Sequence, residues 1–394
     1  FFKKIINVNI FLKLNISLYL VNKNISSKSN KEKVAIILTD SFTYKYYASH
    51  IVKTSDRNFI ILGNFSKKEK NKEYSDTKKV KFIDIKVSRK KICIHDFLLI
   101  FKISKILKEN NVDKVITFMP KTNVLGQIAS KLSGIKFSIL ISSGQLWISR
   151  HGIARHLLLY LERLTIMLCD ILVADSKSQF SLLKKIHPGY KNKLKYVMGL
   201  KARDFKKVKP IKKKIKKLVI GHIGLFNKRK GTEEAIEIAE KCLSLDLKLI
   251  FRFVGVVDEI KFQNDIRKLK LKYPKKVVFK NSFFNFEKEI SRIDILLMPS
   301  KWEGFGIAAV EAAKLRKIVI GYDVIGLKDS IINNKTGHRV KFKDKNSIIK
   351  LFKMYSENNK KLIKLQNSSY KISRERFKSS VTINKLIKIL GLVN

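Results

Sequence analysis

The sequence contains few of the residues that mark several large classes of protein. Among its 394 residues only three are cysteines, and Cys93, Cys169 and Cys242 stand far apart with no CxxC pair. We therefore expect neither a disulfide framework nor a zinc site, and predict buried, reduced thiols in a cytosolic protein. The chain also lacks any run of about 18 uncharged apolar residues, so no transmembrane helix is predicted.

Acidic residues are scarce as well. Asp and Glu total 32 against 84 Lys and Arg, which gives a formal net charge of +52. Because 45% of the residues are apolar, this is the composition of a globular protein and not of a disordered one. Nucleic acid, an anionic membrane surface and phosphorylated substrates all suit such a positive field, and composition does not choose among them.

The order of apolar segments indicates the fold class. From Lys31 onward short apolar runs alternate with helical periodicity, which predicts parallel βαβ units in an α/β protein. Residues 201–217 contain ten Lys or Arg and Pro210, and are predicted to be an exposed basic linker. We predict an N-terminal extension (1–30), a first domain (31–200), the linker (201–217), a second domain (218–372) and a C-terminal helix (373–394) that returns to the first domain.

The segment 294–313 is the most informative for chemistry. A buried strand leads into a loop that carries Glu303, then Gly304, Phe305 and Gly306, and an Ala-rich helix that contains Glu311. Glycines allow backbone N–H groups to approach a ligand, and the new helix adds unpaired N–H groups. Two carboxylates eight residues apart can accept hydrogen bonds from sugar and ribose hydroxyls. The alternative is a plain strand–loop–helix connection with two solvated glutamates.

A second segment, 219–234, shows a similar pattern. An apolar strand enters a turn that contains Gly224, followed by Lys228, Arg229, Lys230 and another glycine before a helix. Backbone amides near Gly224 together with Lys230 suit a diphosphate. Since basic residues are abundant throughout the chain, a basic surface loop is the alternative.

These two segments resemble retaining glycosyltransferases of family 4, which have the GT-B fold of two facing Rossmann-like domains with a cleft between them. The Glu303-Gly-Phe-Gly-x4-Glu311 segment is similar to the family's Glu-x7-Glu motif. The resemblance implies that Glu303 contacts the donor sugar, that Glu311 holds the nucleotide ribose, and that the amides of Phe305, Gly306 and Ile307 face the sugar and diphosphate.

The loop from Gly224 to Gly231 resembles the family's Gly-Arg-Leu-x3-Lys-Gly loop. The resemblance implies that Gly224 and Lys230 lie at the donor diphosphate. The family's arginine is Leu225 in this chain, so Lys228 or Arg229 would have to supply that phosphate contact.

Segments of the first domain resemble the branch of the family that builds capsule and exopolysaccharide. These are Pro120-Lys-Thr-Asn-Val-Leu-Gly126, Ser143-Gly-Gln-Leu-Trp147 and Ala174-Asp-Ser-Lys-Ser-Gln179. The acceptor-side candidates are Lys121, Gln145 and Trp147, with a half-buried packing role for Trp147 as the alternative. Many relatives have histidine where this chain has Ser143.

The histidines do not suggest a metal site. His151 and His156 are five residues apart and so do not share a helical face, and no Asp-x-Asp pair ends a strand. We predict no essential metal and no cofactor beyond the sugar nucleotide. His222 lies in an apolar strand and is expected to be packed in the core.

The function expected from this resemblance is transfer of a sugar, with retention, from a nucleotide-sugar such as a UDP-sugar to a lipid-linked saccharide in cell-surface polysaccharide synthesis. Glu303 and Lys230 are the predicted catalytic residues. An anionic membrane surface is an expected partner, with the enzyme on the inner face of the cell membrane, and nucleic acid is not. The alternatives are a basic binding protein for nucleic acid or membrane without chemistry, and a GT-B epimerase of UDP-sugars.

Overall fold

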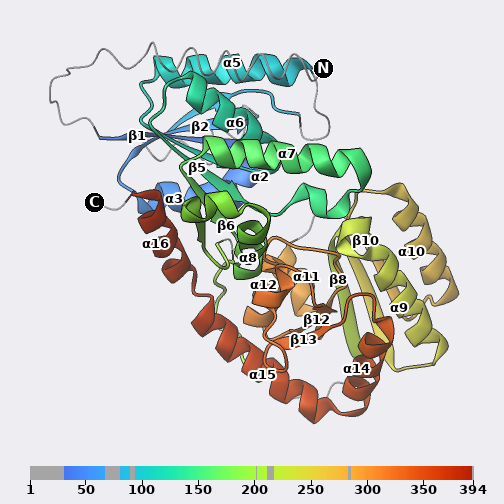
Figure 1. The fold of residues 1–394 in the computed structure, drawn as a ribbon. Helices are drawn as coiled ribbons and strands as arrows, with labels where there is room; N and C mark the ends of the chain where they lie inside the picture. The colour runs from blue at the N-terminus through green and yellow to red at the C-terminus, as the bar shows by residue number, and fades with distance from the viewer. Residues whose placement is uncertain are drawn as a thin grey trace. The chain divides into compact units, whose positions relative to one another are not determined.

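The computed structural model describes residues 31–66, 80–88, 94–200, 202–210, 217–282 and 285–392. Within them the chain builds two parallel sheets flanked by helices (Figure 1). The predicted α/β architecture of two Rossmann-like domains is confirmed. The predicted extension (1–30) and Cys93 lie outside the described residues.

The first sheet has seven strands in the described residues, and every neighbouring pair is parallel. Both faces are covered by helices, so strand interiors such as residues 34–38 are fully buried and uniformly apolar. Along the sheet the strands are β3 (Val80–Asp84), β2 (Asn58–Asn64), β1 (Lys33–Asp40), β4 (Lys114–Phe118), β5 (Phe137–Ser142), β6 (Ile171–Ala174) and β7 (Leu194–Tyr196).

The helices of the first domain alternate with these strands. A short helical segment follows β1 and comprises α2 (Ser41–Thr43), a π-helical turn (Tyr44–Ala48) and α3 (Ser49–Thr54). The others are α5 (Ile94–Glu109), α6 (Pro120–Leu132), the 3₁₀ turn η2 (Leu146–Ser149), α7 (Gly152–Leu168), α8 (Lys177–Ile186) and the 3₁₀ turn η3 (Pro188–Lys193).

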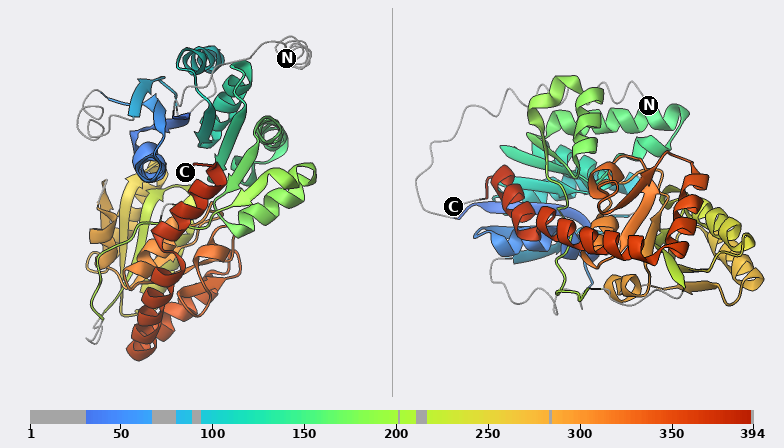
Figure 2. Two further views of the ribbon diagram at one scale, coloured as in Figure 1. Left: turned by 90° about the vertical axis from the view of Figure 1, so that its left-hand side faces the viewer. Right: turned by 90° about the horizontal axis from the view of Figure 1, so that it is seen from below.

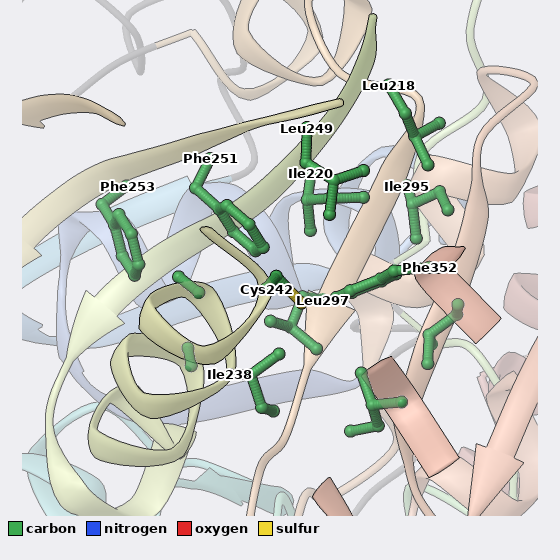
Figure 3. Packing of buried hydrophobic residues seen from close by; sticks show 14 of the residues in the cluster. Leu218, Ile220, Ile238, Cys242, Leu249, Phe251, Phe253, Ile295, Leu297 and Phe352 are labelled. Atoms are coloured by element: carbon green, nitrogen blue, oxygen red, sulfur yellow. The ribbon is translucent and has the colours of Figure 1, made fainter. Parts of the chain in front are cut away.

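The second sheet has six parallel strands in the described residues. Its core joins Phe251 and Leu297 of the sheet to Ile238 and Phe352 of the covering helices (Figure 3). The strands are, in order, β10 (Val277–Asn281), β9 (Leu249–Val257), β8 (Leu218–Phe226), β11 (Ile295–Met298), β12 (Ile318–Tyr322) and β13 (Gly337–Val340). The helices are η4 (Lys228–Lys230), α9 (Thr232–Ser244), α10 (Ile260–Lys272), α11 (Phe286–Ser291), α12 (Ile307–Lys314), α13 (Leu327–Ser330) and α14 (Lys345–Glu357).

Two helices end the chain. α15 (Asn359–Arg376) runs without a break through the predicted boundary at residue 372, and α16 (Ser379–Leu390) follows it. Leu386, Ile387 and Leu390 of α16 join the apolar core that contains Val34 and Ile116 of the first sheet. α16 thus lies beside α3 of the first domain (Figure 2).

The segment predicted as an exposed linker differs from that prediction at its start. Ala202 and Phe205 are only 2% and 8% exposed. Ala202 packs with Phe305 and Phe377, whereas Phe205 packs beneath α12. The apolar residues within this basic segment therefore anchor it to the second domain.

Both described cysteines are buried and unpaired. Burial raises the pKa of the Cys169 thiol and of the Cys242 thiol to about 12 in each case. Both thiols are therefore neutral at pH 7. The prediction that these two cysteines are buried is confirmed. None of the helices in the described parts of the chain has the length and apolar character needed to span a bilayer.

Candidate active site

The carboxyl ends of two neighbouring strands bring Glu303 and Lys230 together. β8 and β11 are adjacent and parallel, and Lys230 follows the first while Glu303 follows the second. Lys230 Nζ lies 2.7 Å from Glu303 Oε1, and Arg229 Nη1 lies 3.6 Å from Glu303 Oε2. The two sequence segments that showed similar patterns thus form one cluster of charges.

The loop after β8 is held by a local cap. Asn227 Oδ1 accepts a hydrogen bond of 2.9 Å from the backbone N–H of Lys230. Gly231 then adopts a left-handed conformation (φ +70°) and begins α9. A Cβ atom at position 231 would overlap the carbonyl of Pro299. Glycine is therefore required here, because it lets the loops after β8 and β11 approach closely.

The loop after β11 fixes the Glu303 carboxylate. The Glu303 N–H donates to the carbonyl of Ile325 at 3.1 Å, and Ser300 Oγ donates to Oε1 at 2.9 Å. Gly306, in a left-handed conformation, begins α12 just beyond this carboxylate. In the first turn of α12 the Ala309 N–H donates to the Gly306 carbonyl at 2.9 Å. The N–H groups of Ile307 and Ala308 have no partner within the helix, so this end of α12 attracts an anion.

The ionisation states in this cluster follow from burial and from mutual attraction. Glu303 is 6% exposed, and burial by itself would raise its pKa; Lys230 and Arg229 outweigh that effect and hold the pKa below its ordinary value. Burial lowers the pKa of Lys230, and the Glu303 carboxylate opposes this shift. Glu303 is therefore an anion at pH 7, and it lies between two basic side chains, Lys230 and Arg229.

Glu311 has a partner that sequence spacing did not reveal. Its Oε1 accepts hydrogen bonds from the N–H and the Nε of Arg203, at 3.1 and 2.8 Å, and its Oε2 accepts one from Nη2 at 3.0 Å. A carboxylate offers about four acceptor positions. A ribose diol would therefore have to share Glu311 with Arg203 or displace it. No spacing rule links residues 108 positions apart, so only the fold could identify this pair.

Gly224 lies in a different local structure from the predicted one. β8 continues past it to Phe226, so the turn begins at Asn227, three residues later than predicted. Gly224 is opposite Gly255 of β9, and a Cβ at 255 would overlap the Gly224 carbonyl. Leu225, which stands at the family's arginine position, is 40% exposed, while Arg229 contacts Glu303.

The three acceptor-side candidates all have partners within the first domain. Lys121 Nζ lies 2.7 Å from Asp96 Oδ1. Gln145 is 1% exposed, and its Nε2 donates to Ser142 Oγ at 3.2 Å. Trp147 is 5% exposed and donates from Nε1 to Glu162 Oε2 at 2.8 Å. Packing therefore accounts for Trp147, whereas the buried Oε1 of Gln145 has no hydrogen-bond partner among the described residues.

Contacts between loops join the first domain to the candidate site. A Cβ at Gly144, in the loop after β5, would overlap the ring of Trp302. Trp302 directly precedes Glu303, and its ring lies 5.0 Å below the guanidinium of Arg229. Farther along, the Gly326 N–H donates to Ser178 Oγ at 3.0 Å. Sequence reasoning missed Trp302, although its position next to Glu303 was a usable signal.

His222 is buried beneath this site. Its Nδ1 lies 3.3 Å from the carbonyl of Leu297 and its Nε2 lies 3.3 Å from Thr232 Oγ1. Burial lowers the His222 pKa to about 4, with a further contribution from Lys230. This histidine is therefore neutral at pH 7, which agrees with a packing role.

The His222 pKa predicts a pH dependence of stability. As the pH falls below 6.5, His222 takes up a proton in the unfolded state but not yet in the folded state, whose pKa is about 4. The stability that the neutral His222 contributes to the fold is therefore complete above pH 6.5 and is lost as the pH falls toward 4. At pH 5 the loss should be about 2 kcal/mol. We expect His222→Gln to reduce the difference in melting temperature between pH 7 and pH 5. His156→Gln, at an exposed histidine, is the control; an undiminished difference in His222→Gln would contradict the assignment.

The described residues contain no group of three or more His, Cys, Asp or Glu side chains placed to hold a metal ion. The positive charge at the site comes instead from Lys230, Arg229 and the N-terminus of α12.

Residues 203–372 match the model of the family described as glycosyl transferases group 1. This part of the chain, which is less than half of its length, is therefore similar to that family. The match contains Glu303, Lys230, Glu311 and Arg203, so the whole charge cluster lies inside it.

Two relatives with similar sequences have names that refer to capsule. An uncharacterized 41.2 kDa protein in the cps region of Klebsiella pneumoniae is 27% identical over 250 residues, which are 59% of this chain and 64% of that protein. The capsular polysaccharide biosynthesis glycosyltransferase CapM of Staphylococcus aureus is 25% identical over 267 residues, 62% of this chain and 65% of CapM. The chain thus spans just under two thirds of each of these relatives.

Solved structures establish the fold over nearly the whole chain. Anabaena HepE in complex with UDP-glucose superposes with a TM-score of 0.72 at 15% identity, covering 92% of this chain and 100% of HepE. This chain therefore has the GT-B fold, and the residues that match the family model lie in its second half.

Proposed function

We propose that the protein transfers a sugar from a UDP-sugar to a lipid-linked saccharide, with retention of configuration, in the synthesis of a cell-surface polysaccharide. The observation that carries this proposal is the Glu303–Lys230–Arg229 cluster in front of the N-terminus of α12. One carboxylate beside two cations and a set of backbone N–H groups suits a sugar attached to a diphosphate.

The chemistry assigns each group a role. Lys230 has three N–H donors, and one of them serves Glu303, so two remain for diphosphate oxygens. Arg229 supplies the second cation, in place of the arginine that is Leu225 here. As the bond from the anomeric carbon to the phosphate oxygen breaks, these cations stabilise the negative charge that develops on the diphosphate. Glu303 orients the sugar and stabilises its developing positive charge.

The acceptor attacks from the same face as the departing diphosphate in this proposal. Its hydroxyl oxygen bonds to the anomeric carbon, its proton passes to the leaving phosphate oxygen, and UDP departs. No metal is assigned a role, since Lys230, Arg229 and the helix terminus meet the phosphate charge. Lys121, Gln145 and Trp147 are the first-domain candidates for contact with the acceptor, and the buried Gln145 Oε1 has no hydrogen-bond partner among the described residues.

The comparisons support the choice of substrates. HepE was solved with UDP-glucose, and two of the sequence relatives are a protein of a cps region and a capsular polysaccharide biosynthesis glycosyltransferase. The net charge of +52 favours a peripheral position on the anionic inner face of the cell membrane, where each well-placed Lys or Arg contributes about 1 kcal/mol.

A screen of sugar nucleotides by thermal shift tests the donor. We expect UDP-sugars to raise the melting temperature, because a ligand that binds only the folded state stabilises it, whereas GDP-sugars should not. Glu303→Ala should reduce the shift, and Lys241→Ala, an exposed lysine on α9, should preserve it. A shift with GDP-sugars alone would contradict the UDP assignment, and recovery of an isomerised UDP-sugar without transfer would indicate an epimerase.

A further inference from the structure

The outward face of α7 is apolar, although surface helices normally expose polar residues. Ile153, Leu157, Tyr160 and Met167 are 88%, 53%, 47% and 46% exposed. Their spacing places them on one stripe of the helix. The buried residues of α7 are on its other side and near its end, so the exposed stripe takes no part in the core of the domain.

The basic residues around this stripe are arginines, whereas most basic residues of the chain are lysines. The chain is rich in lysine, yet it contains none between Lys136 and Lys177. The cations of the α7 region are Arg150, Arg155 and Arg163, all of them exposed. Arginine binds phosphate groups through two parallel hydrogen bonds, which lysine cannot do. Arg155 lies over the ring of the buried Trp147, 5.5 Å from its centroid, so Arg150 and Arg163 are the arginines beside the stripe. An apolar stripe with arginines beside it is typical of helices that lie in the interface of a bilayer.

The acidic residue of α7 does not offset this charge at the surface. Glu162 Oε2 accepts a hydrogen bond from Trp147 Nε1 at 2.8 Å and lies 3.0 Å from His187 Nε2. Its side chain is 17% exposed. The carboxylate is thus turned toward the domain, and the rim of the stripe is cationic.

We propose that the outward face of α7, formed by Ile153, Leu157 and Tyr160, docks on an anionic phospholipid bilayer. The charge favours this occupant over a second copy of the chain. Two copies paired through α7 would bring arginine-rich rims together, and like charges facing each other across an interface are unfavourable. Lipid phosphates instead complement Arg150 and Arg163.

The position of α7 connects this surface to the candidate active site. The helix follows η2 and the loop with Gly144, and Gly144 packs against Trp302 beside Glu303. Leu146, in the same connection, is 44% exposed. Docking would thus bring the bilayer, and with it a lipid-linked acceptor, to the first-domain side of the site. Only this consequence rests on the proposed function; the docking surface does not.

Sedimentation of the full-length protein with vesicles tests the proposal. We expect binding to phosphatidylcholine vesicles that contain about one third phosphatidylglycerol, and weaker binding to pure phosphatidylcholine or in high salt. The triple variant Ile153→Ser, Leu157→Ser, Tyr160→Ser should lose about tenfold or more in partitioning. The matched control is Leu245→Ser, Ile260→Ser, Leu271→Ser, at residues 53%, 68% and 81% exposed on the second domain; it should bind like the wild type.

Equal binding of the two triple variants would overturn the proposal. So would light scattering that shows a dimeric wild type and a monomeric α7 variant, because a second copy would then cover the stripe. A fluorescent label on the cysteine of Leu157→Cys tests whether another part of the chain covers this face. If the emission of the label indicates an apolar environment before vesicles are added, the face is already covered and the proposal is wrong. Turnover of UDP-sugar with a water-soluble acceptor should be equal in all variants, so failure of docking and failure of the proposed transfer are distinguishable.

Discussion

Replacement of Lys230 by alanine is expected to lower the rate of sugar transfer about a thousandfold or more, while the protein stays folded. Lys230 Nζ lies 2.7 Å from Glu303, at the place where the diphosphate would depart. Without this cation the charge on the leaving group is stabilised by Arg229 and the helix terminus alone. The expected loss is in kcat, measured as UDP release at saturating donor.

Matched variants make this result specific. Lys228→Ala removes an exposed lysine two residues earlier and should leave the rate nearly unchanged. Glu303→Ala should abolish transfer as well, because it removes the carboxylate that faces the sugar and leaves Lys230 beside Arg229 without an anion. A near-normal rate in Lys230→Ala would show that this lysine does not contact the diphosphate.

The largest expected effect on stability is that of Lys314→Ala. The Lys314 side chain is fully buried, and Nζ donates to Asp204 Oδ1 at 2.7 Å, to the Arg203 carbonyl at 3.1 Å and to the Phe377 carbonyl at 2.7 Å. Its removal leaves two carbonyls without this donor and an unfilled space, at a cost of about 3 kcal/mol. This corresponds to a fall of roughly 6–12 °C in melting temperature.

Two further variants identify the cause of that fall. Lys314→Met fills most of the space but cannot donate, so it should remain clearly less stable than the wild type. Lys241→Ala, at an exposed position, should change stability by less than about 0.5 kcal/mol. If Lys314→Met melts at the wild-type temperature, the hydrogen bonds of Lys314 are not what holds the segments at residues 203 and 377 together.

Only the structure shows which groups the cations behind the net charge of +52 contact. Some of the lysines form hydrogen bonds with backbone carbonyls of the protein itself. Lys114 Nζ donates to the carbonyls of Leu390 and Gly391, and Lys193 Nζ donates to that of Cys169. Both lysines thereby cap the ends of helices, where carbonyls lack partners within the helix. Composition shows only the number of cations, whereas the partner of each one depends on the fold.

The sequence alone was sufficient for the alternation of strands and helices, because a strand buried on both faces must be continuously apolar. It also sufficed to place Glu303 and Lys230 on loops after strands, since glycines and a change of periodicity mark those turns. Residues 218–226 show the limit of such reasoning. The glycine at 224 suggested a turn, but its neighbour in β9 is Gly255, and pairing with that strand carries β8 on to Phe226.

Tertiary structure alone decided which charges meet. The ion pair of Arg203 with Glu311 and the contact of Lys314 with Asp204 join residues more than 100 positions apart. Trp147 and Gln145 proved to be packed in the first domain, while Trp302 lies between Gly144 and Arg229. The periodicity of a sequence predicts whether a side chain faces the core, because that direction depends only on the strand or helix that contains the residue. Which residue the side chain contacts depends on how elements far apart in the sequence pack together, and local spacing does not determine this.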